Sequence, residues 1–244
     1  MRVLWVCNIM LPVIAEALHR EASNKEGWLS GLLSQIVDRE DTGMTLAVAF
    51  PAPAGEEIPR SFAVRVQGGH PACVAEAASA PERDGGYLVR CYGFHEDTVH
   101  PDHYQPELEE ELRKITEAFR PDVIHCFGTE YPHTLAVCRV YPHPERILLG
   151  IQGICSLCAE AYFADLPERV TRKVTFRDLV KRDSLRSQQE KFARRGVMER
   201  EAIGLAGNIT GRTAWDREVT TGWNPGAQYY PMNETLRVSF YEGS

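Results

Sequence analysis

The sequence predicts an α/β fold, a Rossmann-like parallel sheet flanked by helices, with a helical, basic insertion near residues 155–204. Short apolar runs alternate with amphipathic stretches, which is the pattern of successive βαβ units. Hydrophobic residues make up 43% of the chain and charged residues 25%, ordinary globular values that exclude a disordered or fibrous protein. No repeat or low-complexity linker divides the 244 residues, so we expect a single domain over 1–244.

Six buried strands are predicted from short apolar runs bounded by turn residues. They span residues 3–7, 44–50, 87–94, 122–127, 146–151 and 208–210. The stretch 51–85 is rich in Pro, Gly and Ala and is typical of a loop, although FAVRV (62–66) within it fits an edge strand.

Helices are predicted where apolar residues recur at helical spacing. Residues 26–39 carry one apolar stripe, formed by Trp28, Leu29, Leu32, Leu33, Ile36 and Val37. Residues 106–119 place their acids early and their bases later, as the helix dipole favours. Further helices are expected over 130–140, in the charged region 155–206, and from Thr213 onward.

The charge is unevenly distributed along the chain. A formal net charge of −7 excludes a general nucleic-acid binder, which would carry a basic domain. Residues 169–195 nevertheless hold ten Lys and Arg against three acids, a net charge of +7, which leaves about −14 on the remainder. Such a stretch is either a solvated helix face or a site for phosphates or an anionic membrane surface.

The seven cysteines are scattered and lie mostly in apolar runs, which is typical of reduced, buried thiols in a cytosolic protein. The apolar run after Arg2 loosely resembles a signal peptide, but Asn8 and Pro12 interrupt it, and residues 3–7 fit a buried strand better. No other stretch approaches the length of a membrane span. We therefore expect a cytoplasmic protein, held at the inner face of the membrane if the basic stretch binds lipid.

Polar residues follow four of the predicted strands, at the edge where a parallel sheet binds its ligands. They are Asn8, Gly128-Thr129-Glu130, Gln152-Gly153 and Gly211-Arg212-Thr213. Arginine binds phosphate oxygens, and carboxylates and amides bind hydroxyls, so this combination suits a polyhydroxylated or phosphorylated ligand. The alternative is that the glycines only permit turns and that Glu130 caps a helix.

Cys155 and Cys158 form a Cys-x-x-Cys pair after the strand 146–151. Zinc would need two further ligands, and neither a second pair nor a Cys-x-x-His is present. The position after a strand fits a thiol oxidoreductase, which is an alternative function. The residues around the pair nevertheless have the pattern of an ordinary amphipathic helix, so we expect both thiols to be buried in helix packing.

The histidines show no metal-binding register, and no metal is expected. His133 follows Glu130 closely enough to face the ligand cleft, whereas His125 lies within a strand and is expected to be a hydrogen-bonded core residue. Three more histidines share a loop and are expected on the solvated surface, namely His95, His100 and His103. The sequence contains no GxSxG, P-loop or GxGxxG motif.

Several stretches resemble a known pattern over nearly the whole chain. They are NKEGWLSGLL, DVIHCFGTEYPH, LLGIQGICS, VTFRDLVKRDSLRSQQEKFARRG, ITGRTAWDR and NPGAQYYPMNETLRVSFYE. Together they resemble the amino-terminal domain of a family 4 glycosyltransferase, a retaining enzyme of the GT-B type, and within that family the bacterial polysaccharide-building members. FGTEYPH, IQGICS and GRTAWDR with NETLR are the most specific pieces.

The resemblance implies an enzyme that transfers a sugar from a nucleotide-sugar donor to a glycan or lipid-linked acceptor, without a metal or other cofactor. Two Rossmann-like domains would face each other across a cleft. The amino-terminal domain would bind the acceptor, and a carboxyl-terminal domain, absent from this chain, would bind the donor. We expect the isolated chain to be inactive, and the segment 169–195 to be solvated or to contact a membrane.

The resemblance also implies roles for residues at the cleft. Acceptor-side residues would be Asn8, Glu130, His133, Gln152 and Gly153, and donor phosphates would contact Gly27 and Arg212.

Three departures limit what carries over from the family. Gln152 stands where many members have a histidine before the glycine, and the Gly-Gly pair usual before Trp28 is missing. The donor-domain signature of two glutamates eight residues apart occurs here only as Glu109 and Glu117, on a predicted helix, so no catalytic residue is assigned. A non-catalytic α/β module that binds sugar or phosphate is the alternative.

Overall fold

The computed structural model describes residues 1–23, 27–39, 43–52, 55–67, 70–76, 86–181 and 183–235. Its strands are β1 (Arg2–Val6), β2 (Thr45–Ala52), β3 (Phe62–Gln67), β4 (His70–Glu76), β5 (Tyr87–His95), β6 (Val123–Phe127), β7 (Ile147–Gly150), β8 (Asn208–Gly211) and β9 (Gln228–Pro231). Its helices are α1 (Pro12–Ala17), α2 (Gly27–Val37), α3 (Glu107–Phe119), α4 (Pro132–Val140), η1 (Pro144–Arg146), α5 (Cys155–Glu160), α6 (Glu168–Thr171), α7 (Phe176–Lys181), α8 (Leu185–Leu205) and α9 (Ala214–Trp223). The predicted α/β class is confirmed.

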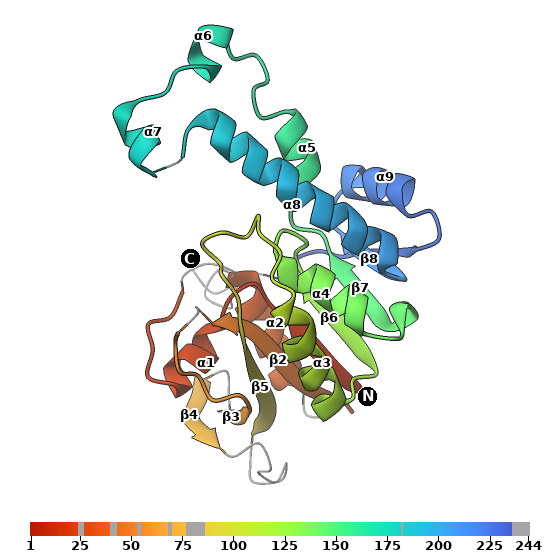
Figure 1. Ribbon diagram of the computed structural model, residues 1–244. Coiled ribbons are helices and arrows are strands. Elements are labelled where there is room, and N and C mark those ends of the chain that lie inside the picture. The colour runs from red at the N-terminus through yellow and green to blue at the C-terminus, as the bar shows by residue number, and fades with distance from the viewer. Residues whose placement is uncertain are drawn as a thin grey trace, which may run out of the picture.

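The strands form one sheet in the order β4-β3-β5-β2-β1-β6-β7-β8-β9 (Figure 1). Neighbours are parallel except where β3 runs antiparallel to both β4 and β5. From β1 the chain builds β2 and then β5 on one side, and afterwards crosses to β6 on the other side of β1. The chain connections therefore leave β1 and β6 in opposite directions, which makes this pair the topological switch point of the sheet.

Strand β1 contributes to two cores because its side chains alternate across the sheet. Leu4 and Val6 pack in the layer formed with α3, α4 and α8, whereas Trp5 packs in the opposite layer with α1 and α2. In that second layer the Phe127 ring meets Trp5 and Trp28 edge to face, with centroids 5.1 and 5.4 Å apart. The amphipathic stripe predicted over 26–39 thus packs α2 against the sheet.

Four elements differ from the sequence expectation, among them β4, which lies in the stretch 51–85 that was expected to be a loop. Helix α1 occupies part of the predicted loop, and Pro12 stands in its first turn, where the missing N–H removes no helical hydrogen bond. FAVRV forms β3, but it is not an edge strand because β4 lies outside it. Strand β9 was not predicted, and its partly exposed sequence QYYP forms the opposite edge of the sheet beside β8.

The predicted helical insertion is confirmed as α5 to α8. Helix α8 runs for 21 residues and begins at Ser184, whose hydroxyl accepts a hydrogen bond from the Ser187 N–H. It crosses α5 in close contact, since a Cβ at Gly196 would lie 2.6 Å from Ser156 Cα. Helices α6 and α7 lie beyond this crossing and project away from the sheet (Figure 1). Among the described residues, no helix combines the length and apolar composition of a membrane span.

Replacing Gly196 with alanine should lower the free energy of unfolding by about 1–3 kcal/mol, because the added methyl forces α5 away from α8. Urea unfolding measures this change. The matched control is Gly204→Ala in the same helix, where a Cβ meets nothing within 4 Å and higher helix propensity should stabilise by up to about 1 kcal/mol. Equal effects of the two substitutions would contradict the tight crossing.

Candidate functional site

The predicted polar residues meet at the carboxyl ends of the central strands. Asn8 follows β1, Glu130 follows β6, Gln152 follows β7 and Arg212 follows β8. The first two lie directly at the topological switch point, where an open parallel sheet leaves a crevice for ligand.

Gly128 lets the side chains of Asn8 and Glu130 converge. Its φ of +92° strains any L side chain, and a Cβ there would collide with the Glu130 carboxylate and lie 2.5 Å from Asn8 Nδ2. A Cβ at Gly153 would lie 3.9 Å from Glu130 Oε1, so the loop after β7 reaches the same carboxylate. The structure therefore brings together four of the residues that follow the predicted strands, namely Asn8, Gly128, Glu130 and Gly153. Gly128 is needed because of its positive φ and because a side chain there would occupy the space of Asn8 and Glu130.

His133 was expected to face the cleft, but it does not. It is fully buried on α4, with Nε2 3.2 Å from Asn8 Oδ1 and Nδ1 2.8 Å from Glu96 Oε2. Its backbone N–H also donates to Glu96 Oε1 at 3.0 Å. Both ring nitrogens therefore lie within hydrogen-bond distance of oxygen atoms. His133 thus supports Asn8 from behind, because the first turn of α4 packs beneath the strand ends.

Glu96 was missed at the sequence level, although a signal for it was available. It is the first residue after β5 and is 1% exposed. The strand-end rule that selected Asn8 and Glu130 selects Glu96 when it is applied to the strand 87–94.

Arg212 lies at the rim of the site and bridges two segments. One guanidinium nitrogen donates to the Gln152 backbone oxygen at 2.9 Å, and another pairs with Glu234 Oε1 at 2.8 Å. Its backbone N–H donates to Asp216 Oδ2, the carboxylate that also forms a capping box with Thr213 at the start of α9. The guanidinium is 39% exposed, so it remains accessible to an anion.

Gly27 is the first residue of α2, and residues 24–26 directly before it lie outside the described residues. The neighbouring Trp28 packs against Phe127 at the end of β6, and its backbone oxygen accepts from Thr235 Oγ1 at 3.3 Å. The first turn of α2 therefore lies beside the strand end that leads into Gly128. Among the described residues, Gly27 makes no hydrogen bond or ion pair with the other predicted site residues.

Helix α8 fastens the loop after β6 from outside the sheet. The fully buried Glu199 accepts from Thr129 Oγ1 at 2.9 Å and from the Ser156 N–H at 3.2 Å. Arg195 Nε donates to the Glu130 backbone oxygen at 2.8 Å. The pKa of Glu199 is raised to about 7. Burial is the main cause and the nearby Glu130 charge acts in the same direction, whereas the hydrogen-bond donors act against them. The insertion and the site loop are thus joined by buried polar contacts.

The cysteine pair has no oxidoreductase character. Cys155 is buried at the start of α5, and burial raises its pKa to about 12, whereas a redox-active cysteine needs a depressed pKa. Cys158 is exposed, which corrects the expectation that both thiols are buried, because it lies on the outer face of α5. Cys7, Cys91, Cys126 and Cys138 are buried as expected and lie outside any disulfide, and the side chain of Cys73 lies outside the described residues.

The expectation of a hydrogen-bonded His125 is wrong, whereas the expectation of three surface histidines is confirmed. His125 is buried as expected, but its Nε2 has no hydrogen-bond partner among the described residues, and burial lowers its pKa to about 3. It is therefore a neutral ring, tilted against Phe127 at a centroid distance of 3.9 Å. The loop histidines are on the surface as predicted, 44 to 67% exposed, namely His95, His100 and His103. No group of three metal-ligating side chains occurs within the described ranges.

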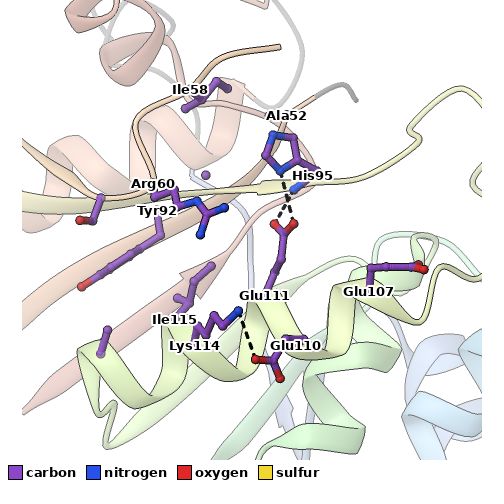
Figure 2. A pocket seen from close by; sticks show the side chains of 13 residues that line it. Ala52, Ile58, Arg60, Tyr92, His95, Glu107, Glu110, Glu111, Lys114 and Ile115 are labelled. Carbon is purple, nitrogen blue, oxygen red and sulfur yellow. Dashed lines mark hydrogen bonds and ion pairs between the residues drawn. The ribbon is translucent and has the colours of Figure 1, made fainter. Parts of the chain in front are cut away.

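A pocket lies elsewhere, in a hollow of about 600 Å³ between β5, residues 58–61 and α3 (Figure 2). Its floor is apolar, with Tyr92 and Ile115, and its mouth carries the His95–Glu111 pair. None of the predicted site residues lines it. The position of the predicted site therefore depends on the strand ends and not on this hollow.

No family model matches the sequence, and no curated protein matches it. Two solved structures are similar in their backbone. One is sucrose-phosphate synthase from Thermosynechococcus elongatus, with 11% identity, a TM-score of 0.41, and coverage of 95% of this chain and 47% of that chain. The other is UGT71G1 from Medicago truncatula complexed with UDP-glucose, with 8% identity, a TM-score of 0.38, and coverage of 95% and 51%. The chain spans about half the length of each structure.

Glu199 should make the stability of the fold depend on pH. Because its folded pKa of about 7 lies above the ordinary 4.5, its contribution is fully present below pH 4.5 and is lost as the pH rises through 7. Glu199→Gln should therefore gain about 2–3 kcal/mol in free energy of unfolding relative to wild type between pH 4.5 and 8, measured by urea unfolding at several pH values.

The matched control is the exposed Glu190 on the same helix, for which Glu190→Gln should follow the wild-type pH profile. If Glu199→Gln also follows the wild-type profile, the buried carboxyl does not titrate in this range.

Proposed function

We propose that this chain is the acceptor-binding half of a retaining glycosyltransferase of family 4. The complete enzyme would move a sugar from a nucleotide-sugar to a glycan or lipid-linked acceptor in surface polysaccharide synthesis. The proposal rests on the family resemblance of the sequence and on one geometric observation. That observation is the convergence of Asn8, Glu130 and Gly153 at the switch point between β1 and β6.

The convergent groups suit a sugar. The Glu130 carboxylate and the Asn8 amide offer acceptor and donor positions for neighbouring hydroxyls, and Gly128 lets these two groups approach each other. Buried contacts to His133 and Glu199 hold the two loops, so the hydroxyl-binding atoms are oriented before ligand arrives. In this proposal Gln152 supplies an amide where relatives have an imidazole, so the group remains neutral at every physiological pH.

Arg212 would serve the donor side. Its guanidinium now pairs with Glu234 and with the Gln152 backbone oxygen, and a diphosphate oxygen could replace the Glu234 carboxylate as the acceptor of the same guanidinium nitrogen. The first turn of α2 at Gly27 would lie on the same side. No metal is needed in this arrangement, because arginine and backbone N–H groups neutralise the phosphates.

The test is a transfer assay on the complete gene product with a panel of nucleotide-sugars and glycan acceptors. Glu130→Gln and Arg212→Ala should each lower kcat/KM by about tenfold or more while circular dichroism stays unchanged. The first should raise KM for acceptor, and the second KM for donor.

The matched control is Glu117→Gln, which alters an exposed carboxylate on α3. Wild-type rates in both site variants would refute the site assignment. Saturable sugar or phosphate binding without transfer to any acceptor would instead identify a binding module.

A further inference from the structure

The segment between α5 and α8, residues 166–181, carries an unusual concentration of exposed apolar side chains. We call it the arm. It holds six of the twelve large hydrophobic side chains that are exposed on the described chain: Leu166, Val170, Val174, Phe176, Leu179 and Val180. Phe176 is 82% exposed and Leu179 68%. Together with Val180 they occupy positions i, i+3 and i+4 of α7, so they share one face of that helix.

The arm is also basic. It contains five cations against the two acids Glu168 and Asp178, and the cations are Arg169, Arg172, Lys173, Arg177 and Lys181. They alternate with the apolar residues along the chain, so that Lys173 precedes Val174 and Lys181 follows Val180. Helices α6 and α7 project away from the sheet (Figure 1). The cations and the apolar side chains of the arm are all exposed on this projection.

Two cations of the predicted basic stretch outside the arm are engaged within the fold. On α8, Arg194 donates to Asp102 at 2.7 Å, and Arg195 donates to the Glu130 backbone oxygen. These contacts hold α8 against the body of the protein. Within the arm, Arg172 pairs with Glu168 and Arg177 with Asp183, and all five arm cations are exposed. The segment 169–195 considered from sequence therefore consists of the exposed arm and a part of α8 that is held by Arg194 and Arg195.

The alternation of charges with apolar residues favours a lipid surface over a protein partner. The centre of a protein–protein interface is depleted of lysine, whereas a bilayer surface lets apolar side chains enter the acyl region while Lys and Arg extend to the lipid phosphates. Net charge points the same way. The chain outside 169–195 carries about −14, so an anionic bilayer would attract the arm and repel the body.

We propose that the arm binds anionic membranes, inserting Phe176, Leu179 and Val180 among the acyl chains while its Lys and Arg side chains bind lipid phosphates. Since α5 starts two residues after Gly153, this contact would hold the strand-end site near the bilayer. A lipid-linked acceptor would be reached there. That last consequence rests on the proposed function, whereas the membrane binding does not.

The experiment is flotation of the 244-residue chain with vesicles of phosphatidylcholine, with and without about one third phosphatidylglycerol. Wild type should float with the anionic vesicles only, and high salt should reduce the bound fraction. The triple substitution Phe176→Ser, Leu179→Ser and Val180→Ser should weaken binding at least about tenfold. Its control is Val99→Ser, which removes an exposed apolar side chain outside the arm and should leave binding unchanged.

The charge contribution is tested separately. Arg169→Gln with Lys173→Gln should weaken binding by about tenfold or more, since each cation contributes a roughly fivefold gain near an anionic surface. The matched control neutralises two exposed cations of α3, Arg113→Gln with Lys114→Gln.

Three outcomes would overturn the proposal: no flotation of wild type, equal flotation with neutral vesicles, or equal loss in a control and its test variant. If instead the lipid-free protein is dimeric and the triple serine variant is monomeric by light scattering, while neither floats, the arm is a self-association surface. All of these measurements are independent of transfer activity, so a failed transfer assay leaves them intact.

Discussion

The pairing of β1 with β6 is the constraint on which the site depends. Parallel strands place their carboxyl ends at one edge, and the chain leaves these two neighbours in opposite directions. The two loops therefore separate, and residues more than a hundred positions apart in sequence face each other across the gap. Gly128 completes the arrangement, because only a residue without a side chain permits both the turn and the approach of Asn8 to Glu130.

Polar groups buried beneath the strand ends hold the two loops beside this gap in defined positions. A buried carboxyl or imidazole is strongly destabilising unless its hydrogen bonds are made, so each such group specifies where its partners must lie. His133 and Glu96 specify the position of Asn8 from the side of α4, and Glu199 specifies that of Thr129 from the side of α8. The insertion is consequently part of the wall of the site, although most of its length lies outside the sheet.

The two ends of the insertion have different environments. Its base is packed so closely that Gly196 has no room for a methyl group, and its polar atoms bond to the site loop. Its tip exposes Phe176 and neighbouring apolar side chains to water. A fold that buries a glutamate at one end and exposes a phenylalanine at the other is consistent with an insertion anchored at the site and directed toward a partner.

The sequence by itself determined the α/β class, six of the strands and the main helices, because apolar periodicity reports burial locally. It also predicted which strand ends carry Asn8, Glu130, Gln152 and Arg212. It did not identify α1, β4 or β9, of which the two strands form by pairing with β3 and β8. Only the tertiary structure decided that His133 is buried, that Cys158 is exposed and that Glu96 and Glu199 support the site. Those outcomes depend on partners 37 to 125 residues away, and a local pattern carries no information about such distant contacts.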